Sequence, residues 1–543
     1  MKQSNGSAGG RTPLFRRLAR LMRQARFQAK HPETGAFFEE WKDVTRASRP
    51  GDASRRDFLK GMAALGLSLP VLGTGRLILP QDSKPSSPSR KDPVAIVGAG
   101  AAGLTCAYRL AKAGVPCTVF EGSERTGGRM LTRYDFNDEK MFVELGAELV
   151  DSNHADLIAL AGELGLEIQD LREGDTGHEL YNFGGQIWTE KEIIERFKPF
   201  AARIDEDLEG LEHEGEYTDK AQALDKMSLA EYLRSIKDGD KTVQRILETA
   251  YTIEYGLDAG EQSALNLIEY IGTDTSDGFK IFGESDESKR VKGGNGNIPN
   301  ALAKAIDGKA PVHFGHRLAK IADDGKEVSL TFTSKGGASK TVKFGRVVLA
   351  IPFTMLRQVE GIDALSLTPE KKASIAGLGY GTNCKVMFGF SERIWRDSKA
   401  TGVPACNGTL LHDKESQHFW ETSRKQPGKS GILTNYRGAK SGLGSFTQER
   451  LDQALTELDA TFKGAKAKHD GKKASWMWPT YEFTQGSYTC PKVGQVTTLF
   501  GATGTDELGG RLLFAGEHTS SDFSGFMNGA IESGNRTAKT LLG

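Results

Sequence analysis

"KDPVAIVGAGAAGLTCAYRLAKAG", residues Lys91–Gly114, decides the fold of this chain. A short apolar run, Val94–Val97, is followed by the glycine pattern G-x-G-x-x-G and then by helical spacing over Leu104–Lys112. A strand, a tight glycine turn and a helix in this order are typical of the first unit of a dinucleotide-binding domain. Gly98 permits the turn, and Gly100 lets backbone N–H groups approach a diphosphate at the positive end of the helix.

The residues that follow complete this unit. Thr118–Phe120 predicts a second strand that ends at Glu121, at the distance where a carboxylate accepts hydrogen bonds from an adenosine ribose. Gly103 lets the helix pack closely on the first strand. We therefore predict an α/β fold with a Rossmann-like nucleotide-binding domain. The residues of this unit predicted to bind the cofactor are Gly98, Gly100, Ala102, Gly103 and Glu121.

Length and composition narrow the other possibilities. The 543 residues, 38% of them apolar, are enough for two hydrophobic cores. The net charge of zero combines a basic segment, 1–60, with an acidic remainder. The acidic remainder argues against nucleic-acid binding and mildly favours cationic ligands. A solvated acidic surface explains the same excess of negative charge. The five scattered cysteines lack metal-ligand spacing, so we expect neither a metal site nor a disulfide framework.

The N-terminal region is interpreted as an export address. Ser54–Lys60, "SRRDFLK", resembles the bacterial twin-arginine signal, and Gly61–Gly73 supplies the apolar segment, too short to span a membrane. We predict a signal region with a basic extension over 1–80 and a Pro/Ser linker over 81–92. The twin-arginine machinery would then deliver the folded protein to the periplasm or outside the cell. The cleavage site stays open.

A second glycine turn ends in Arg129, within "ERTGGR" from Glu124. It supplies more N–H donors and a cation for a diphosphate, and it resembles the GGR motif of the flavin-containing amine oxidase family, which includes monoamine, polyamine and L-amino acid oxidases. Further segments resemble that family in the same order along the chain. They are "ELGAEL" (Glu144–Leu149), "VKGGNGNIPNALAKAI" (Val291–Ile306), "FGHRLAKI" (Phe314–Ile321) and the C-terminal run Arg511–Leu542.

The resemblance implies a noncontiguous FAD-binding domain and an α+β substrate domain. We expect residues 93–151, 288–360 and 487–543 to form the former, and residues 152–287 and 361–486 the latter. Alternation at Val328, Leu330 and Phe332 predicts a β-hairpin, and Ser228 to Glu231 predicts a helix with a capping box. The further residues that the resemblance assigns to FAD are Arg129, Gly146, Ala147, Leu318, Glu517, Phe526 and Met527.

Three positions carry the chemistry that the resemblance implies. Ser487 stands where animal monoamine oxidases bind FAD through a cysteine, so we expect noncovalent FAD. Tyr488 and Phe526, the latter replacing the usual tyrosine, would hold the substrate nitrogen between two π-faces. Lys385 matches the lysine that holds a water at flavin N5; a solvent-facing strand position is the alternative. Tyr488 and Phe526 are also explained by ordinary core packing.

The substrate class is open between amines and amino acids. L-Amino acid oxidases of this superfamily carry an arginine where this chain has Leu149, and the adjacent Glu148 suits a second cationic group. This favours a monoamine, diamine or polyamine, oxidised to an aldehyde with release of ammonia or an amine and hydrogen peroxide. An exported L-amino acid oxidase that yields a 2-oxo acid, in particular from basic amino acids, is the alternative.

Other functions that fit the sequence use a different electron acceptor or involve no catalysis. Oxygen is the expected acceptor, and a desaturase or a dehydrogenase with another acceptor is a further option. A binding protein without turnover is disfavoured because Lys385 and Tyr488 are retained. The sequence leaves the oligomeric state open, with a homodimer as one option.

Overall fold

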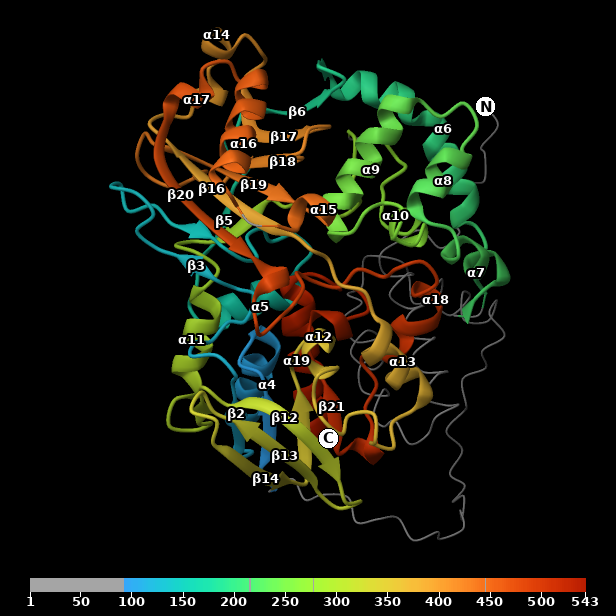
Figure 1. Ribbon diagram of the computed structural model, residues 1–543, viewed down its shortest axis with the longest axis vertical. Coiled ribbons are helices and arrows are strands. Elements are labelled where there is room, and N and C mark those ends of the chain that lie inside the picture. Colours follow the sequence, from blue (N-terminus) through green and yellow to red (C-terminus); the bar gives the residue numbers. More distant parts are fainter. Residues whose placement is uncertain (1–91, 214–215, 277, 445) are drawn as a thin grey trace, which may run out of the picture.

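The computed structural model describes residues 92–543 except 214–215, 277 and 445, and is drawn in Figure 1. The predicted export signal and almost all of the linker lie outside the described residues. No helix within the described part of the chain combines the length and the apolar character that crossing a membrane requires.

A five-stranded parallel sheet forms the nucleotide-binding half of the molecule. Its order is β11 (Val312–His313), β2 (Cys117–Phe120), β1 (Val94–Val97), β15 (Arg346–Leu349) and β21 (Leu512–Phe514). The strands come from all three segments expected to build the FAD domain. Strand β1 is buried throughout, as expected for a central parallel strand covered on both faces.

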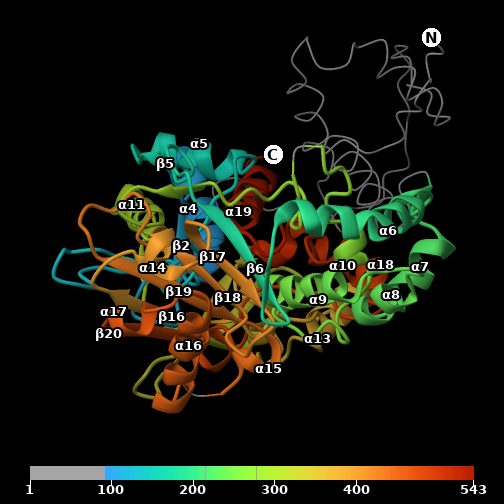
Figure 2. The same cartoon turned by 90° about the horizontal axis from the view of Figure 1, so that it is seen from above.

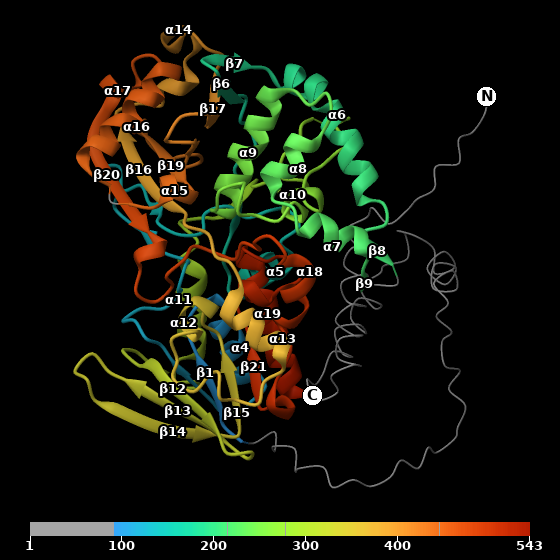
Figure 3. The ribbon, with the colours of Figure 1, turned by 45° about the vertical axis from the view of Figure 1, so that its right-hand side comes forward.

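Alternate side chains of β1 point to opposite faces of this sheet. Val94 and Ile96 pack with helices α4 (Ala101–Lys112), α11 (Asn297–Ile306) and α19 (Met527–Leu542). Ala95 and Val97 pack toward an antiparallel three-stranded sheet on the other face, visible at the lower left of Figure 3. This sheet consists of β12 (Arg317–Asp323), β13 (Val328–Thr333) and β14 (Ser339–Phe344). The predicted alternation in β13 is confirmed, because its residues are alternately buried and half-buried.

A seven-stranded mixed sheet and a group of helices form the other half, seen from above in Figure 2. Strand β16 lies between β20 and β19, and all seven of its residues are buried. In spatial order the strands are β20 (His469–Met477), β16 (Cys384–Phe390), β19 (Gly431–Arg437), β18 (His418–Glu421), β17 (Cys406–His412), β6 (His178–Phe183) and β7 (Gln186–Trp188). The helices beside this sheet are α6 (Glu190–Leu208), α7 (Asp219–Asp225), α8 (Leu229–Ser235), α9 (Lys241–Tyr255) and α10 (Leu265–Ile268).

Local signals set several boundaries. The capping box predicted at Ser228 is present: its side chain accepts from the Glu231 N–H, and the Glu231 carboxylate accepts from the Ser228 N–H. Helix α13 (Pro369–Gly377) lies beyond residue 360, where the substrate segment was expected to begin. It nevertheless packs with the nucleotide half, through Ile375 in that core and through the buried Lys371, whose Nζ donates to the Thr503 carbonyl at 2.7 Å.

The remaining strands and α-helices of the described chain complete the element list. They are β3 (Thr132–Arg133), β4 (Val143–Glu144), α5 (Ala155–Glu163), β5 (Ile168–Asp170), β8 (Glu212–His213), β9 (Glu216–Tyr217), β10 (Lys289–Val291), α12 (Phe353–Leu356), α14 (Ser398–Thr401), α15 (Ala439–Gly442), α16 (Gln448–Thr461), α17 (Ala465–Lys468) and α18 (Val496–Leu499).

Candidate active site

The glycine turn after β1 has the geometry that its sequence requires. Gly98 has φ +108°, and a Cβ there would lie 2.5 Å from the Ala350 carbonyl oxygen. A Cβ on Gly103 would lie 2.0 Å from the Gly98 carbonyl oxygen, so α4 can approach the strand only with glycine at this position. A Cβ on Gly100 would meet no atom within 4 Å. The chain is therefore open at Gly100, where a ligand would approach.

The N-terminus of α4 suits a diphosphate. No side chain caps this helix at Gly100, and Ala101 and Ala102 in its first turn line a large cavity. Uncapped N–H groups and the helix dipole together favour an anion at such an end. The second glycine turn is held beside the first by a hydrogen bond of 2.8 Å from the Gly127 N–H to the Ala99 carbonyl.

Glu121 is buried at the end of β2 with its carboxylate fixed. It accepts hydrogen bonds from the backbone N–H of Ala99 at 2.7 Å and of Ser123 at 2.8 Å. Because each carboxylate oxygen can accept more than one hydrogen bond, the group can still receive ribose hydroxyls from the cavity that it lines.

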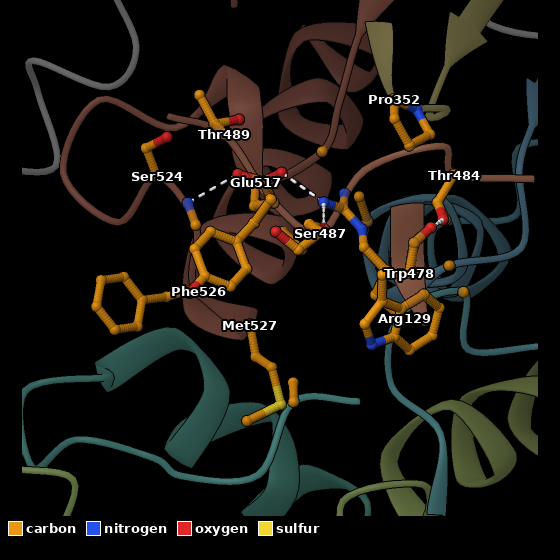
Figure 4. A pocket seen from close by; sticks show the side chains of 18 of the residues that line it. Arg129, Pro352, Trp478, Thr484, Ser487, Thr489, Glu517, Ser524, Phe526 and Met527 are labelled. Carbon is orange, nitrogen blue, oxygen red and sulfur yellow. Dashed lines mark hydrogen bonds and ion pairs between the residues drawn. The ribbon is translucent and has the colours of Figure 1, made fainter. Parts of the chain in front are cut away.

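Arg129 joins three distant parts of the chain, as Figure 4 shows. Its Nη1 donates to the Ser487 carbonyl at 2.7 Å and forms an ion pair with Glu517 at 2.7 Å, and the other oxygen of Glu517 accepts the Gly525 N–H at 2.7 Å. The charge of Arg129 is therefore already matched by Glu517. The uncapped N–H groups at the N-terminus of α4 are therefore the main groups that would bind a diphosphate.

One cavity of about 1040 Å³ connects these residues with the second half of the molecule. We call its part beside Gly98, Glu121 and Leu318 the nucleotide end, and its part beside Lys385, Tyr488 and Phe526 the substrate end. The predicted site residues that line the cavity are Gly98, Gly100, Ala102, Glu121, Arg129, Gly146, Ala147, Glu148, Leu318, Lys385, Tyr488, Glu517, Phe526 and Met527. Gly103 instead lies behind Gly98, where it permits the close packing.

The cavity fits FAD in its donor chemistry as well as its size. Two uncapped helix N-termini open into it, that of α4 at Gly100 and that of α19 at Phe526. They suit a diphosphate and the electron-rich edge of a flavin ring, respectively. The volume of about 1040 Å³ lies just above the range of roughly 300–1,000 Å³ for ligand sites, as suits a ligand as large as FAD.

Lys385 is buried on the central strand β16, so it does not face solvent. Its Nζ donates to the Gly146 carbonyl at 2.8 Å and forms an ion pair with Glu148 at 3.0 Å. It also lies 4.8 Å from the centre of the Trp420 ring. The protein itself therefore provides the partners that hold this ammonium group.

The partnership corrects the expectation for Glu148. One carboxylate oxygen is paired with Lys385, and the other accepts the Thr422 hydroxyl at 2.7 Å. Burial by itself would raise the pKa of Glu148, but Lys385 and Arg290 outweigh it and hold the pKa below its ordinary value. Because its charge is already matched, Glu148 is not the free carboxylate that a second substrate amine requires.

Tyr488 and Phe526, which we call the aromatic pair, both line the substrate end. The Tyr488 hydroxyl donates to the Glu254 carbonyl and pairs with the Tyr436 hydroxyl at 2.9 Å. The Phe526 ring meets the His154 ring edge-on, with centroids 5.2 Å apart. Hydrogen bonding and packing therefore fix both walls.

Several residues of the substrate end belong to no motif of the sequence. Trp420 lies on β18 and Tyr436 on β19. They lie near Lys385 because of how these strands are aligned in the sheet, where Tyr436 is paired with Lys385. Glu254 lies in the last turn of α9, and Glu287 lies just before β10. Burial raises the pKa of Glu254 to about 7 and that of Glu287 to about 8.

Positive charge is scarce at this end of the cavity. Among the described residues that line it, the lysines and arginines are Arg129, Arg317 and Lys385. The first and last are ion-paired, and Arg317 lies on β12 beside Leu318, at the nucleotide end. Burial lowers the pKa of His418 to about 3, so this lining residue is neutral. The described substrate end thus offers no unmatched cation.

Comparisons with known proteins agree with this geometry. The profile of the family described as flavin containing amine oxidoreductase matches residues 101–542. The chain is similar to an L-amino-acid oxidase of Sistrurus catenatus edwardsii, 25% identical with 84% of this chain and 87% of the relative covered. It is similar to an L-amino acid dehydrogenase of Synechocystis sp., 24% identical with 87% and 99% covered. A solved structure, cyclohexylamine oxidase from Brevibacterium oxydans IH-35A, matches with TM-score 0.71, 20% identity, and 83% and 98% covered.

Proposed function

The chain belongs to the flavin-containing amine oxidoreductase family, and from this premise we propose that it is a FAD-dependent amine oxidase. Its reaction would convert an amine to an imine, which water hydrolyses to an aldehyde and ammonia or a smaller amine, while oxygen is reduced to hydrogen peroxide. FAD, when bound, accepts the two electrons taken from the C–H beside nitrogen.

The observation that carries the proposal is the charge of the substrate end. A substrate carboxylate placed there would have no matching cation among the described lining residues, and a buried unpaired charge costs several kcal/mol. An amine brings no such group. Leu149, which also lines the cavity, is apolar where a carboxylate-binding arginine would be needed.

The chain's own residues position the amine and exclude water. Tyr488 and Phe526 would hold the substrate nitrogen between their rings, and Lys385 with Glu148 would place a fixed ion pair beside the reacting atoms. Backbone N–H groups of α4 and the Glu121 carboxylate would hold the diphosphate and the ribose. We expect no covalent link, because Ser487 has a hydroxyl and no cysteine of the described chain lines the cavity.

An L-amino acid oxidase is the second candidate, favoured by the L-amino acid enzymes among the relatives. Anaerobic reduction of the bound flavin separates the candidates without assuming an acceptor. We expect alkylamines and diamines to reduce it faster, in kcat/KM, than the matching L-amino acids. Faster reduction by L-amino acids would replace the proposal with the second candidate. Reoxidation by oxygen, measured separately, tests the oxidase against a dehydrogenase.

Export of the folded holoprotein is part of the proposal and rests on "SRRDFLK" alone. An unfolded chain has no nucleotide site, so FAD would be bound before translocation, and the twin-arginine route carries folded proteins. Replacing Arg55 and Arg56 by lysine should leave yellow holoprotein in the cytoplasm. Unimpaired export of this variant would exclude the route.

A further inference from the structure

Arg290 is a buried cation whose presence the chemistry derived above does not explain. It lies on β10 and forms no ion pair with any described residue, and within the described chain its Nε has no hydrogen-bond partner. Its guanidinium donates to the Thr422 carbonyl at 2.8 Å and to the Arg424 carbonyl at 2.7 Å, and it lies 4.8 Å from the centre of the Phe142 ring. A buried charge held in this way is costly unless an opposite charge further away balances it.

One of these contacts leads directly to Glu148. Thr422, whose carbonyl Arg290 binds, donates its hydroxyl to one oxygen of the Glu148 carboxylate at 2.7 Å. The other oxygen of this carboxylate is ion-paired with Lys385 at 3.0 Å. Thr422 is thus fixed through its backbone and orients the carboxylate through its side chain. All four residues are buried, so water competes little for these contacts.

The segment that carries Arg290 also fixes the backbone of Glu148. Asn295, in the loop after β10, donates from Nδ2 to the Glu148 carbonyl at 2.7 Å. Asn295 is itself held, because its Oδ1 accepts the N–H of Val291, the residue after Arg290, at 3.0 Å. Arg290 and Glu148 are therefore connected by a second route, and a displacement of β10 would move the carboxylate.

The charges of this cluster agree with its contacts. Burial would raise the pKa of Glu148, but Lys385 and Arg290 outweigh it and keep this pKa low. The nearby Glu144 differs, because burial raises its pKa to about 7 although two hydrogen bonds reach its carboxylate. Below pH 7, Glu148 is therefore the carboxylate whose negative charge balances Arg290.

We propose that Arg290 is a positioning residue for Lys385 and acts through Glu148. By fixing Thr422 it orients the carboxylate, and by its charge it keeps the carboxylate ionised. Lys385 would then stay bound to the Gly146 carbonyl at the wall of the cavity. This rests on the proposed function, since the lysine takes part in the flavin chemistry of that proposal. Arg290 does not line the cavity, so it acts on the reaction only through its neighbours.

A double-mutant cycle on the holoenzyme tests whether the arginine acts through the lysine. Anaerobic flavin reduction by pentylamine is measured in the wild type, in Arg290→Met, in Lys385→Met and in the double variant. We expect Arg290→Met to slow reduction about tenfold in the wild-type background, as loss of one charged interaction predicts. In the Lys385→Met background it should change the rate by less than about twofold. An equal loss in both backgrounds would overturn the proposal.

Arg346→Met is the matched control for the loss of a buried arginine. Arg346 lies on β15 in the nucleotide half and donates to the Leu541 carbonyl at 2.9 Å. Any effect of this variant on flavin reduction should be the same in the wild-type and Lys385→Met backgrounds. Non-additivity as large as that of Arg290→Met would mean general destabilisation and would overturn the proposal.

Thr422→Val tests the same connection if Arg290→Met does not fold. Valine lacks the hydroxyl that donates to Glu148, while the backbone carbonyl bound by Arg290 remains. We expect roughly threefold slower flavin reduction in the wild-type background and no further loss in the Lys385→Met background. A loss that persists with Lys385→Met would count against the proposal.

The charge of Arg290 is tested by the pH profile. Without this charge the pKa of Glu148 rises, so at low pH more of the carboxyl is protonated and no longer pairs with Lys385. The rate of Arg290→Met relative to wild type should therefore increase from roughly pH 6 to 9, also in the Glu144→Gln background, which excludes titration of that neighbour. Arg290→Lys keeps the charge and should give a ratio independent of pH. A flat profile for Arg290→Met, or a persisting slope for Arg290→Lys, would overturn the proposal.

Thermal unfolding of the holoenzyme in excess FAD gives a measurement without turnover. Arg290→Met should lower the Tm, and this loss should be roughly halved in the Glu148→Gln background, where no carboxylate needs the arginine. Equal losses would mean that Arg290 only anchors the turn after β18. If L-amino acids and not amines reduce the flavin, the proposed function fails, and the same cycle run with L-norleucine still tests Arg290.

Discussion

The two ends of the cavity are built in different ways. The nucleotide end is made largely of backbone, from two glycine turns and the N-terminus of α4. The substrate end is made of side chains, among them Lys385, Tyr488 and Glu287, which come from a strand and two loops far apart in the sequence. FAD, the cofactor that the family implies, would be bound by backbone groups whose positions the fold sets. Substrate specificity would instead depend on individual side chains of the substrate end, which single substitutions can change.

The largest effect is expected at the substrate end, from Lys385→Met. Methionine leaves Glu148 buried without its partner, which should destabilise the protein by about 3–5 kcal/mol, and flavin reduction should slow although FAD still binds. Adding Glu148→Gln should restore most of the stability but not the rate. Denaturant unfolding and stopped-flow reduction measure the two effects. Wild-type rates in the single variant would show that Lys385 is structural.

The next effect tests the backbone of the nucleotide end. Gly103→Ala places a Cβ against the Gly98 carbonyl and should destabilise the apoprotein by about 1–3 kcal/mol. Gly100→Ala meets open space, so the apoprotein should keep its Tm while its affinity for FAD falls. Thermal unfolding without FAD and titration with FAD distinguish the two variants. If both variants lose apoprotein stability equally, Gly100 does not face the ligand.

A smaller effect is expected on stability as a function of pH. The folded-state pKa values of Glu254 and Glu287, about 7 and about 8, exceed the ordinary value, so the folded state binds their protons more tightly. Their contribution to stability is complete below the unfolded pKa and is lost as the pH rises through 7 and 8. The Tm of the amine-free protein should therefore fall between pH 6 and 9 by more than that of the Glu254→Gln/Glu287→Gln variant. Identical falls would contradict this.

The same contrast explains what the sequence could predict. Some features depend on residues that are close together in the chain, so residue spacing alone predicts them. These are the turn at Gly98 and Gly103, the carboxylate Glu121 and the capping box at Ser228. The pairing of Lys385 with Glu148 depends on how distant segments are placed in space, and spacing carries no such information.

The boundary of the substrate segment is a similar case. Helix α13 has a recognisable start, because Thr368 caps it, but only tertiary packing decides which core it joins. Likewise, Glu254 and Glu287 belong to no motif, and their burial and shared cavity appear only once α9 and the loop before β10 are packed.

The smallest effect is expected at Phe526 in the substrate end, the residue directly before α19. Phe526 is the N-cap residue of α19, whose first turn has no side-chain cap and lines the cavity, and its ring packs against His154. Phe526→Leu removes the ring but keeps the backbone, so FAD affinity should be retained. Loss of the aromatic contacts, worth about 0.5–1.5 kcal/mol, should lower kcat/KM for amines roughly 2–10-fold.

Phe526→Tyr is the matched control for this prediction, since it keeps the ring and restores the residue usual in the resembling family. Its kcat/KM should remain within about twofold of the wild type, because the π-face is unchanged and the added hydroxyl lies at the ring edge. Flavin reduction by pentylamine and 1,4-diaminobutane measures both variants. If Phe526→Leu equals the wild type, the ring only fills space, and Tyr488 alone would form the aromatic wall. If Phe526→Leu instead loses FAD, the residue belongs to the nucleotide end, and the division between a backbone-built and a side-chain-built end fails at this position.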